Sequence, residues 1–281
     1  MGTLYIVGTP IGNLGDLTPR AAEVLAAVDF IAAEDTRVSV KLLNHLGLKK
    51  PLVSCHEHNI REMSGRITAR LLAGEDCAIV TDAGMPCISD PGQQLVEACH
   101  ALHIPVLAVP GPTAVASAVA LSGLSSSRWS FEGFLSVNRS SRAQHLAEIR
   151  EERRTMVFYE APHKLLHTLE DLLETLGDRE LAICREITKL HEETRRTTLS
   201  QAVEYYRQNA PKGEFVLVIA GAQPRQEAAL TFSEAVDMTR SLMADGLSPT
   251  MAAKQAARDT GYKKADLYRA AIQPDDEDPE E

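Results

Sequence analysis

The sequence predicts an α/β protein made of two α/β domains and a small C-terminal helical appendage. The first observation is that short apolar runs alternate with amphipathic stretches through residues 1–121, which is typical of a mainly parallel sheet covered on both faces. The second is that more apolar runs and helical stretches follow a Ser- and Gly-rich linker at 122–128. The third is that helical patterns alone occupy residues 223–272.

The first domain is expected to hold five strands, because five short apolar runs are separated by amphipathic stretches. Thr18 can cap the first helix and Pro19 fits its first position, while Gly74 and Gly123 end two later helices. The expected strands are 4–7, 30–33, 52–54, 78–81 and 106–109, and the helices after the one at Pro19 are 38–46, 60–72, 93–102 and 114–121.

The same kind of alternation predicts a second α/β domain over residues 129–222. Gly177 is expected to end one of its helices, and Ser200 is expected to cap another that reaches Arg207. The expected strands are 156–159, 181–185 and 215–220, and the first helix is 165–176.

The helical appendage is predicted from its capping residues. Thr231 and Glu234 have the spacing of a capping box, and Ser248-Pro249 begins a second helix. The second and third helices have helix-turn-helix spacing, which is a weak signal for nucleic-acid binding, so we favour a role in packing or dimerisation. The final stretch, 273–281, is predicted to be a disordered acidic tail.

Composition narrows the class of protein. Five cysteines occur without a CxxC pair, which indicates a reduced, cytoplasmic protein with neither a disulfide framework nor a zinc site. No signal peptide or stretch long enough to span a membrane is evident. The net charge is −10, but residues 275–281 hold six of the 39 acids, and the remaining 33 acids against 29 bases give −4. Charge alone therefore gives no support for nucleic-acid binding.

The first informative loop, Gly8-Thr9-Pro10-Ile11-Gly12-Asn13-Leu14-Gly15-Asp16, joins the first expected strand to the first helix. Its glycines allow a ligand to approach the backbone closely. Pro10 stands where a dinucleotide-binding loop has its second glycine, and proline has no amide proton for a pyrophosphate. The loop therefore argues against NAD or FAD.

Two further loops follow the fourth and fifth expected strands. Residues 81–92 combine two aspartates, two glycines and two prolines, and residues 109–114 combine Gly, Pro and a hydroxyl. Asp82 can accept hydrogen bonds from hydroxyls or an amine, and Asp90-Pro91 is interpreted as the start of the next helix. Because ligands bind outside the carboxyl ends of parallel strands, the three loops together predict one pocket.

These motifs resemble the tetrapyrrole-methylase family. The resemblance rests on GTPIGNLGDLT at 8–18, DAGMPCISDPG at 82–92 and PGPTA at 110–114, and it continues over about residues 1–222 through FYEAPH, REITK and GEFV. The long forms of the first two motifs are similar to the branch that methylates the ribose 2′-hydroxyl of a cytidine in small-subunit ribosomal RNA. Met85 stands where metabolic members carry an aspartate, which argues against a tetrapyrrole substrate.

The resemblance implies that S-adenosylmethionine lies in a cleft between the two α/β domains. It also implies a cytoplasmic homodimer, without membrane association, that acts on small-subunit ribosomal RNA in the assembled subunit. Carried over motif by motif, the expected cofactor-binding residues are Pro10, Asp82, Ala83, Gly84, Thr113, Ala114, Tyr159, Glu214, Phe215 and Val216.

Methyl transfer to a ribose hydroxyl needs no metal, but it gains from a base or from a cation beside the developing alkoxide. We expect Lys189, Glu186 and Glu160 to be catalytic, with Lys189 near the phosphate or alkoxide and a glutamate taking the proton. Arg185 and Arg37 are expected to bind RNA. If the strand before Arg185 continues, alternation puts Arg185 and Glu186 on opposite faces.

Two other functions stay open at this point. A small-molecule, tetrapyrrole-type methyltransferase would keep the same loops and lack the basic residues at positions 37, 164, 185, 189, 195 and 196. A non-enzymatic RNA-binding protein would not need three crowded Gly/Pro loops on one sheet edge.

Overall fold

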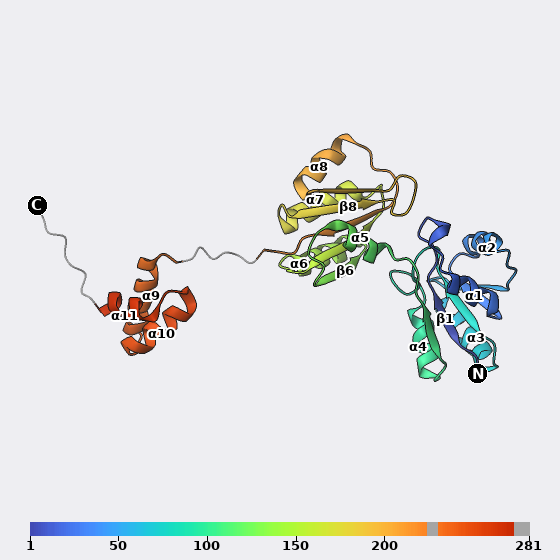
Figure 1. Ribbon diagram of the computed structural model, residues 1–281, viewed down its shortest axis with the longest axis horizontal. Coiled ribbons are helices and arrows are strands. Elements are labelled where there is room, and N and C mark those ends of the chain that lie inside the picture. Colours follow the sequence, from blue (N-terminus) through green and yellow to red (C-terminus); the bar gives the residue numbers. More distant parts are fainter. Residues whose placement is uncertain (224–229, 273–281) are drawn as a thin grey trace, which may run out of the picture. The chain divides into compact units, whose positions relative to one another are not determined.

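A computed structural model describes residues 1–223 and 230–272 of the chain, so the acidic tail predicted at 273–281 lies outside the described residues. The chain divides into two compact units, Met1–Ala222 and Gln223–Glu281 (Figure 1). In the described part of the chain, no helix is both long and apolar enough to cross a membrane.

The first sheet consists of five parallel strands in the order β3-β2-β4-β1-β5. Successive residues of one strand face opposite sides: Phe30 and Ala32 join one apolar cluster, and Ile31 and Ala33 join another. Helices therefore cover both faces, as predicted. The strands are β1 (Leu4–Val7), β2 (Phe30–Ala33), β3 (Leu52–Ser54), β4 (Cys77–Val80) and β5 (Val106–Val109), and the helices are α1 (Pro19–Ala27), α2 (Thr36–His45), α3 (Ile60–Leu72) and α4 (Gln93–Ala101).

The strand order explains why the three motif loops meet. β1 lies between β4 and β5 in the sheet, and all three strands run in the same direction. The loops that follow these strands, which begin at Gly8, Thr81 and Pro110, therefore leave the same edge of the sheet side by side.

The second sheet is mixed, with the order β6-β7-β10-β8-β9 and only β6 and β7 parallel. Three elements were not predicted: both edge strands and α6 (Arg139–Ile149). The edge strand β9 reads ETRRTT and so lacks an apolar run. Thr198, not Ser200, caps α8. The other elements are β6 (Trp129–Gly133), β7 (Thr155–Glu160), α7 (Leu165–Leu176), β8 (Glu180–Arg185), β9 (Glu193–Thr198), α8 (Leu199–Gln208) and β10 (Phe215–Ile219).

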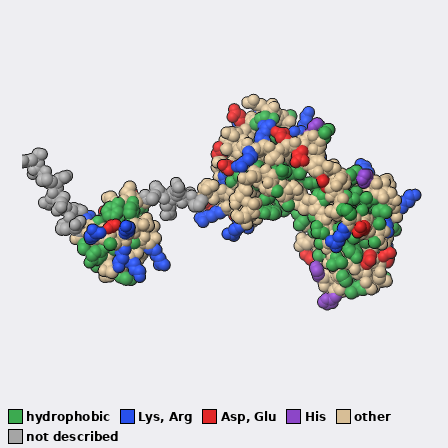
Figure 2. Space-filling view, in the orientation of Figure 1, with side chains coloured by type: hydrophobic (Ala, Val, Ile, Leu, Met, Phe, Trp, Pro, Cys, Tyr) green, Lys and Arg blue, Asp and Glu red, His purple; other side chains and the backbone are tan. Residues whose placement is uncertain are grey.

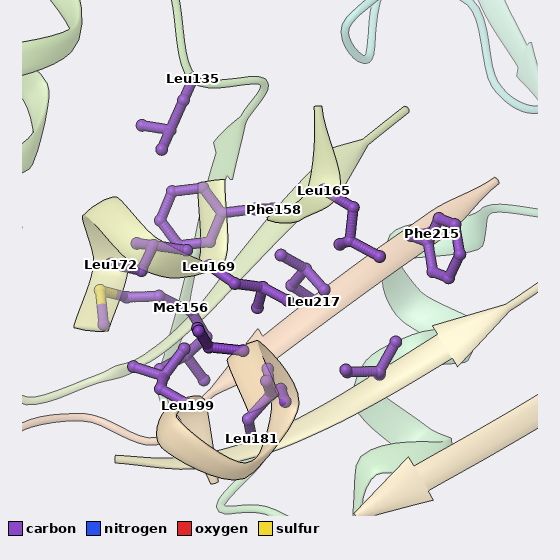
Figure 3. Packing of buried hydrophobic residues seen from close by; sticks show 14 of the residues in the cluster. Leu135, Met156, Phe158, Leu165, Leu169, Leu172, Leu181, Leu199, Phe215 and Leu217 are labelled. Carbon is purple, nitrogen blue, oxygen red and sulfur yellow. The ribbon is translucent and has the colours of Figure 1, made fainter. Parts of the chain in front are cut away.

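Helices α7 and α8 pack leucines against one face of this sheet. Figure 3 shows Leu169 and Leu172 of α7 and Leu199 of α8 around Met156 and Leu217 of the central strands. All five side chains are fully buried. This packing fixes β7 and β10, whose ends carry several of the expected site residues.

Helix α5 (Ala114–Ser122) follows β5 in the chain, and the sequence grouped it with the first domain. Its buried residues Val115, Ala118 and Val119 instead pack on the second sheet, against residues such as Val157 and Val216. The covalent link between the two sheets is therefore the short segment 110–113 that precedes this helix.

The part of the second unit that the structure describes, residues 230–272, contains three helices, α9 (Phe232–Ala244), α10 (Pro249–Thr260) and α11 (Lys264–Ile272). The capping box predicted at Thr231 and Glu234 is present, with the Thr231 side chain accepting from the Glu234 amide and the Glu234 carboxylate accepting from the Thr231 amide. Buried alanines of α9 and α10 pack with Leu267 of α11 in a separate small core. The unit thus has its own apolar interior.

Candidate active site

A cavity of about 550 Å³ lies between residues of the two sheets. Its size falls in the range of about 300–1,000 Å³ that is usual for small-molecule sites. The first sheet contributes loops after β1, β4 and β5, and the second contributes the ends of β7 and β10. The lining residues include Ile11, Ala83, Gly84, Asp90, Thr113, Ala114, Phe134, Tyr159, Glu160, Ala161, Glu214, Phe215 and Val216.

Backbone contacts lock the three loops of the first sheet together. Thr9 and Gly84 exchange two hydrogen bonds, of 2.9 and 3.1 Å between nitrogen and oxygen. Gly8 and Gly111 touch so closely that a Cβ on Gly111 would lie 2.8 Å from backbone atoms of Gly8. The glycines are therefore needed for the approach of the loops, which holds Gly84 in the cavity wall at φ +83°.

Tyr159 joins the second sheet to helix α5. Its hydroxyl oxygen accepts a hydrogen bond of 3.1 Å from the amide of Val115, in the first turn of the helix. Phe131 and Phe134 make edge contacts with its ring. Thr113 caps the helix through Ala116. The first turn of α5, with Thr113 and Ala114 in the cavity wall, is thus held from both sides.

Glu160 lies in the cavity wall but is almost fully buried, at 3% exposure. One carboxylate oxygen accepts from the amide of Ala161, and the other accepts from the hydroxyl of Thr168. Both oxygens therefore have internal donors. This arrangement favours a structural role that fixes the end of β7 over the proton transfer expected from the sequence.

Lys189 bridges two glutamates, of which Glu214 lines the cavity. Its Nζ donates to Glu186 Oε1 at 3.0 Å and to Glu214 Oε2 at 2.8 Å. Its side chain also crosses the first sheet's loop at Gly12, and the neighbouring Thr188 hydroxyl donates to Asp16. Segment 186–192 thus connects the second sheet to the loop after β1.

The expected alternation of Arg185 and Glu186 does not occur, because β8 ends at Arg185. Glu186 and Thr188 have φ values of +50° and +66°, so the chain turns instead of continuing as a strand. The turn is held by two hydrogen bonds between Glu186 and Glu214, one from the Glu186 amide to a carbonyl and one from the Glu214 amide to Oε1. It brings Glu186 and Lys189 together.

The charge states of this pair follow from its contacts. Burial alone would raise the pKa of Glu186, but hydrogen bonds from the Glu214 amide and from Lys189 outweigh it and lower the pKa. Burial would lower the pKa of Lys189, but the two carboxylates outweigh it and raise the pKa. Lys189 therefore stays a cation, and Glu186 is a weak base.

Asp90 is a wall residue that was not among the site residues expected from the sequence. It was interpreted as the start of the next helix, but α4 begins at Gln93 with Gly92 as its cap. Asp90 lines the cavity and receives no hydrogen bond from any described residue. Burial, together with the charges of Glu34 and Asp82, raises its pKa to about 7. The signal in the sequence was an acid in a loop that leaves the ligand-binding edge of the sheet.

The raised pKa of Asp90 predicts a pH-dependent stability. The folded state favours the protonated carboxyl of Asp90. The contribution of this carboxyl to folding stability is therefore complete below its ordinary pKa of 3.8 and is lost as the pH rises through about 7. Asp90→Asn, which is always neutral, should raise the melting temperature at about pH 8 by a few degrees and leave it unchanged near pH 4. Thermal melts at both pH values would measure this. The exposed Asp237→Asn should show no such difference, and equal shifts for the two variants would contradict the assignment.

Six expected residues are not among those that line the large cavity. Lys189 and Glu186 lie next to Glu214, which does line it, and the other four lie further away. Pro10 and Asp82 line a second, smaller cavity of about 170 Å³. Arg37, with 88% of its side chain exposed, pairs with Asp35 at 2.6 Å. Arg185 donates to the carbonyl of Lys212 at 2.6 Å and pairs with Glu193 at 3.4 Å. By contrast, Ala83, Gly84, Thr113, Ala114, Tyr159, Glu214, Phe215 and Val216 all line the large cavity.

The lining of the large cavity fits a ligand with positive charge. Among the described residues that form it, three are acidic, namely Asp90, Glu160 and Glu214, and none is Lys or Arg. Such a lining disfavours a pyrophosphate and suits a sulfonium or an amine. No group of three or more His, Cys, Asp or Glu suited to a metal ion is found in the described part of the chain.

Comparison with known proteins assigns the class. A sequence model of the tetrapyrrole (corrin/porphyrin) methylases matches residues 3–203. The chain therefore belongs to the tetrapyrrole methylase family. It is 48% identical over 274 residues to ribosomal RNA small subunit methyltransferase I of Synechocystis, covering 97% of this chain and 98% of that protein.

Two further relatives carry the same name. The protein of Pseudomonas aeruginosa is 44% identical over 275 residues, covering 97% of each chain. The protein of Thermotoga maritima is 49% identical over 223 residues, which cover all of that protein but 79% of this chain. The first unit here, residues 1–222, is also 79% of 281 residues.

Solved structures share the fold. The methyltransferase CobJ aligns with a TM-score of 0.61 at 19% identity, over 80% of this chain and 97% of that chain. Uroporphyrin-III-C-methyltransferase from Thermus thermophilus aligns with a TM-score of 0.56 at 21% identity, over 78% and 94%. The two-sheet architecture is therefore that of this family.

Proposed function

We propose that this chain transfers a methyl group from S-adenosylmethionine to the ribose 2′-hydroxyl of a cytidine in small-subunit ribosomal RNA. The observation that carries the proposal is the acidic, cation-free lining of a cavity large enough for this cofactor, in a chain that is 48% identical to a ribosomal RNA methyltransferase. The cofactor supplies a methyl group that its sulfonium already activates, so the chain must supply positioning and proton handling.

The cofactor-binding residues would come from both sheets. We assign Ala83 and Gly84, in the loop after β4, and Thr113-Ala114, after β5, to one side of the ligand, and Tyr159 and the segment 214–216 to the other. The backbone contacts between the loops keep this wall in place before any ligand arrives. Pro10 and Asp82 support the wall from the side of the smaller cavity.

Lys189 and Asp90 are assigned the chemical roles. We assign to the Lys189 ammonium, which Glu186 and Glu214 hold, the stabilisation of the negative charge that develops on the attacking hydroxyl oxygen. Asp90 is in the cavity wall without a competing hydrogen bond, so it can take the hydroxyl proton. Glu186 then positions Lys189, and Glu160 fixes the end of β7.

The proposed substrate is the assembled small subunit, and the proposed form of the enzyme is a cytoplasmic homodimer. On the face shown in Figure 2, acidic and basic side chains of the first unit are interspersed. This pattern favours a folded ribonucleoprotein surface over a long bare RNA strand. The exposed side chains of Leu107, on the edge strand β5, and of Leu102, just after α4, support a subunit interface.

The two alternative functions are less well supported. Relatives at 44–49% identity carry an RNA methyltransferase name, and basic residues occupy the positions that a small-molecule enzyme would not need. A protein that only binds RNA would not require the cavity. Calorimetry with S-adenosylmethionine tests cofactor binding, and transfer of labelled methyl to small subunits from a strain lacking the modification tests the substrate. Binding without transfer to subunits would overturn the RNA assignment.

The second unit should be dispensable for cofactor binding. The relative of Thermotoga maritima matches this chain over a length equal to the first unit, and every residue lining the large cavity lies within residues 1–222. A chain ending at Ala222 should therefore bind S-adenosylmethionine within about twofold of the full chain and melt within a few degrees of it. Calorimetry and thermal melts of both chains would show this. Loss of binding would mean that the helical unit shapes the cavity.

A further inference from the structure

The smaller cavity shares a wall with the larger one. Pro10 and Asp82 line the smaller cavity, and the residues that follow them, Ile11 and Ala83, line the larger one. The loops after β1 and β4 therefore form the partition between the two spaces. A molecule bound in the smaller cavity would lie about one chain thickness from a ligand in the larger cavity.

The size of the smaller cavity restricts its occupant. At about 170 Å³ it is well below the roughly 300–1,000 Å³ of sites that hold a whole cofactor or drug-sized ligand. Its apolar residues include Pro10, Leu14, Val38 and Leu42. Such a space suits one flat ring packed between apolar side chains.

The polar groups of this cavity suit a base edge. Asp82 Oδ1 accepts from the amide of Asp35 at 3.2 Å, and Oδ2 receives no hydrogen bond from any described residue. Thr81 also lines the cavity, and its hydroxyl is fully buried without a partner. A buried hydroxyl without a partner costs stability unless a ligand satisfies it. Lys41, a third polar residue of the lining, is exposed.

We propose that the smaller cavity binds the extruded cytosine base of the target nucleotide. This inference rests on the proposed function. Asp82 accepts from the exocyclic amine, and Thr81 pairs with a ring nitrogen or oxygen. The ribose crosses the partition towards the larger cavity. Enzymes that act on one nucleotide commonly hold its base in such a pocket, by hydrogen bonds to the pairing edge and by apolar packing.

The charges around the cavity support a base over a phosphate. Asp82, Asp35 and Glu34 lie together, since the Asp82 amide donates to Glu34 at 3.4 Å and the Asp35 amide donates to Asp82, and the carboxylates disfavour a phosphate beside Asp82. Of these acids Asp82 lines the cavity, and a carboxylate is a usual acceptor for the amine of cytosine. Arg37 and Lys41 are exposed, so they are available to the phosphates of the same nucleotide.

The test fills the cavity. Val38→Phe, on α2, places a ring inside the cavity, and Val40→Phe adds the same ring on an exposed position of that helix, outside the cavity. The full-length proteins are compared for S-adenosylmethionine affinity by calorimetry, for binding of small subunits, and for methyl transfer to subunits. We expect Val38→Phe to lower kcat/KM for subunits about a hundredfold, with cofactor affinity unchanged. Val40→Phe should match the unsubstituted protein.

A second pair of variants tests the hydrogen bonds without filling the cavity. Thr81→Val keeps the shape of the side chain and should lower kcat/KM about tenfold, with cofactor affinity retained and the melting temperature retained or raised. Asp82→Asn can accept from cytosine or donate to uracil. On subunits rebuilt with uridine at the nucleotide found to be methylated, it should reduce the preference for cytidine about tenfold.

The outcomes separate the two levels of inference. An unsubstituted protein that binds the cofactor but does not methylate subunits would overturn the proposed function and the base pocket with it. If the unsubstituted protein is active, equal kcat/KM for Val38→Phe and Val40→Phe overturns the base pocket alone. Loss of cofactor affinity in a folded Val38→Phe or Thr81→Val protein also overturns it, because the cavity would then belong to the cofactor site. If Val38→Phe does not fold, Thr81→Val and Asp82→Asn test the base pocket instead, and kcat/KM and cytidine preference equal to those of the unsubstituted protein in both variants would overturn it.

Discussion

Lys189→Ala is expected to lower turnover about a hundredfold and to leave cofactor affinity intact, the usual effect of removing one group that stabilises a developing oxyanion. The reason is that Lys189 contributes a fixed positive charge, which the carboxylates of Glu186 and Glu214 hold in place. The raised pKa of Lys189 keeps that charge through the neutral range. Single-turnover methyl transfer at saturating cofactor and subunits would measure the effect.

Two variants control this experiment. Lys212→Ala removes an exposed lysine nearby and should leave turnover within about twofold, because surface charges contribute little. Glu186→Gln keeps an acceptor for the Glu214 amide and should slow turnover less than Lys189→Ala does. Near-normal turnover in Lys189→Ala would show that the site works by orientation alone.

Gly111→Ala is expected to cost about 1–3 kcal/mol of stability and to weaken S-adenosylmethionine binding by tenfold or more, because the added methyl group would overpack the contact between two loops. The new Cβ would lie 2.8 Å from the Cα, carbonyl carbon and oxygen of Gly8, and backbone atoms cannot rotate away. The loop after β1 must then move, and with it Ile11 in the cavity wall. Denaturant unfolding and calorimetry on the same preparations would test both effects.

The matched control is Gly65→Ala. Gly65 lies inside helix α3, and a Cβ there would meet nothing within 4 Å. This variant should be more stable than the original by about 0.5–1 kcal/mol, because alanine loses less backbone freedom in a helix. Replacing glycine with alanine should therefore lower the stability at position 111 and raise it at position 65. A stable Gly111→Ala protein with normal cofactor affinity would mean that the loops do not need their close contact.

The first sheet was predictable because every one of its strands is an apolar run. β2 and β4 are buried on both faces, so their sequences FIAA and CAIV carry a continuous signal. The second sheet was only partly predictable, because its edge strands are half-exposed. β9 carries Arg195 and Arg196, which pair with Glu193 and Glu180, and such a strand has no apolar pattern to detect.

The candidate site was also predictable only in part. The loop motifs located the cavity, because residues such as Gly84 and Thr113 sit where strand ends meet. The roles within it depend on tertiary contacts that no motif contains. Both carboxylate oxygens of Glu160 accept hydrogen bonds, and Glu186 accepts from Lys189 and from the Glu214 amide. Asp90 lines the cavity and accepts no hydrogen bond from a described residue. Separating these acids needs the three-dimensional environment of each carboxylate.

Because α5 packs on the second sheet, one four-residue segment, Pro110-Gly111-Pro112-Thr113, is the sole covalent connection between the two halves of the first unit. Its two prolines hold their φ angles near −65°. The connector is therefore stiff, and its last residue caps the helix whose first turn lines the cavity. We expect a connector restricted in this way to reduce the conformational entropy that the two halves lose when a ligand binds between them.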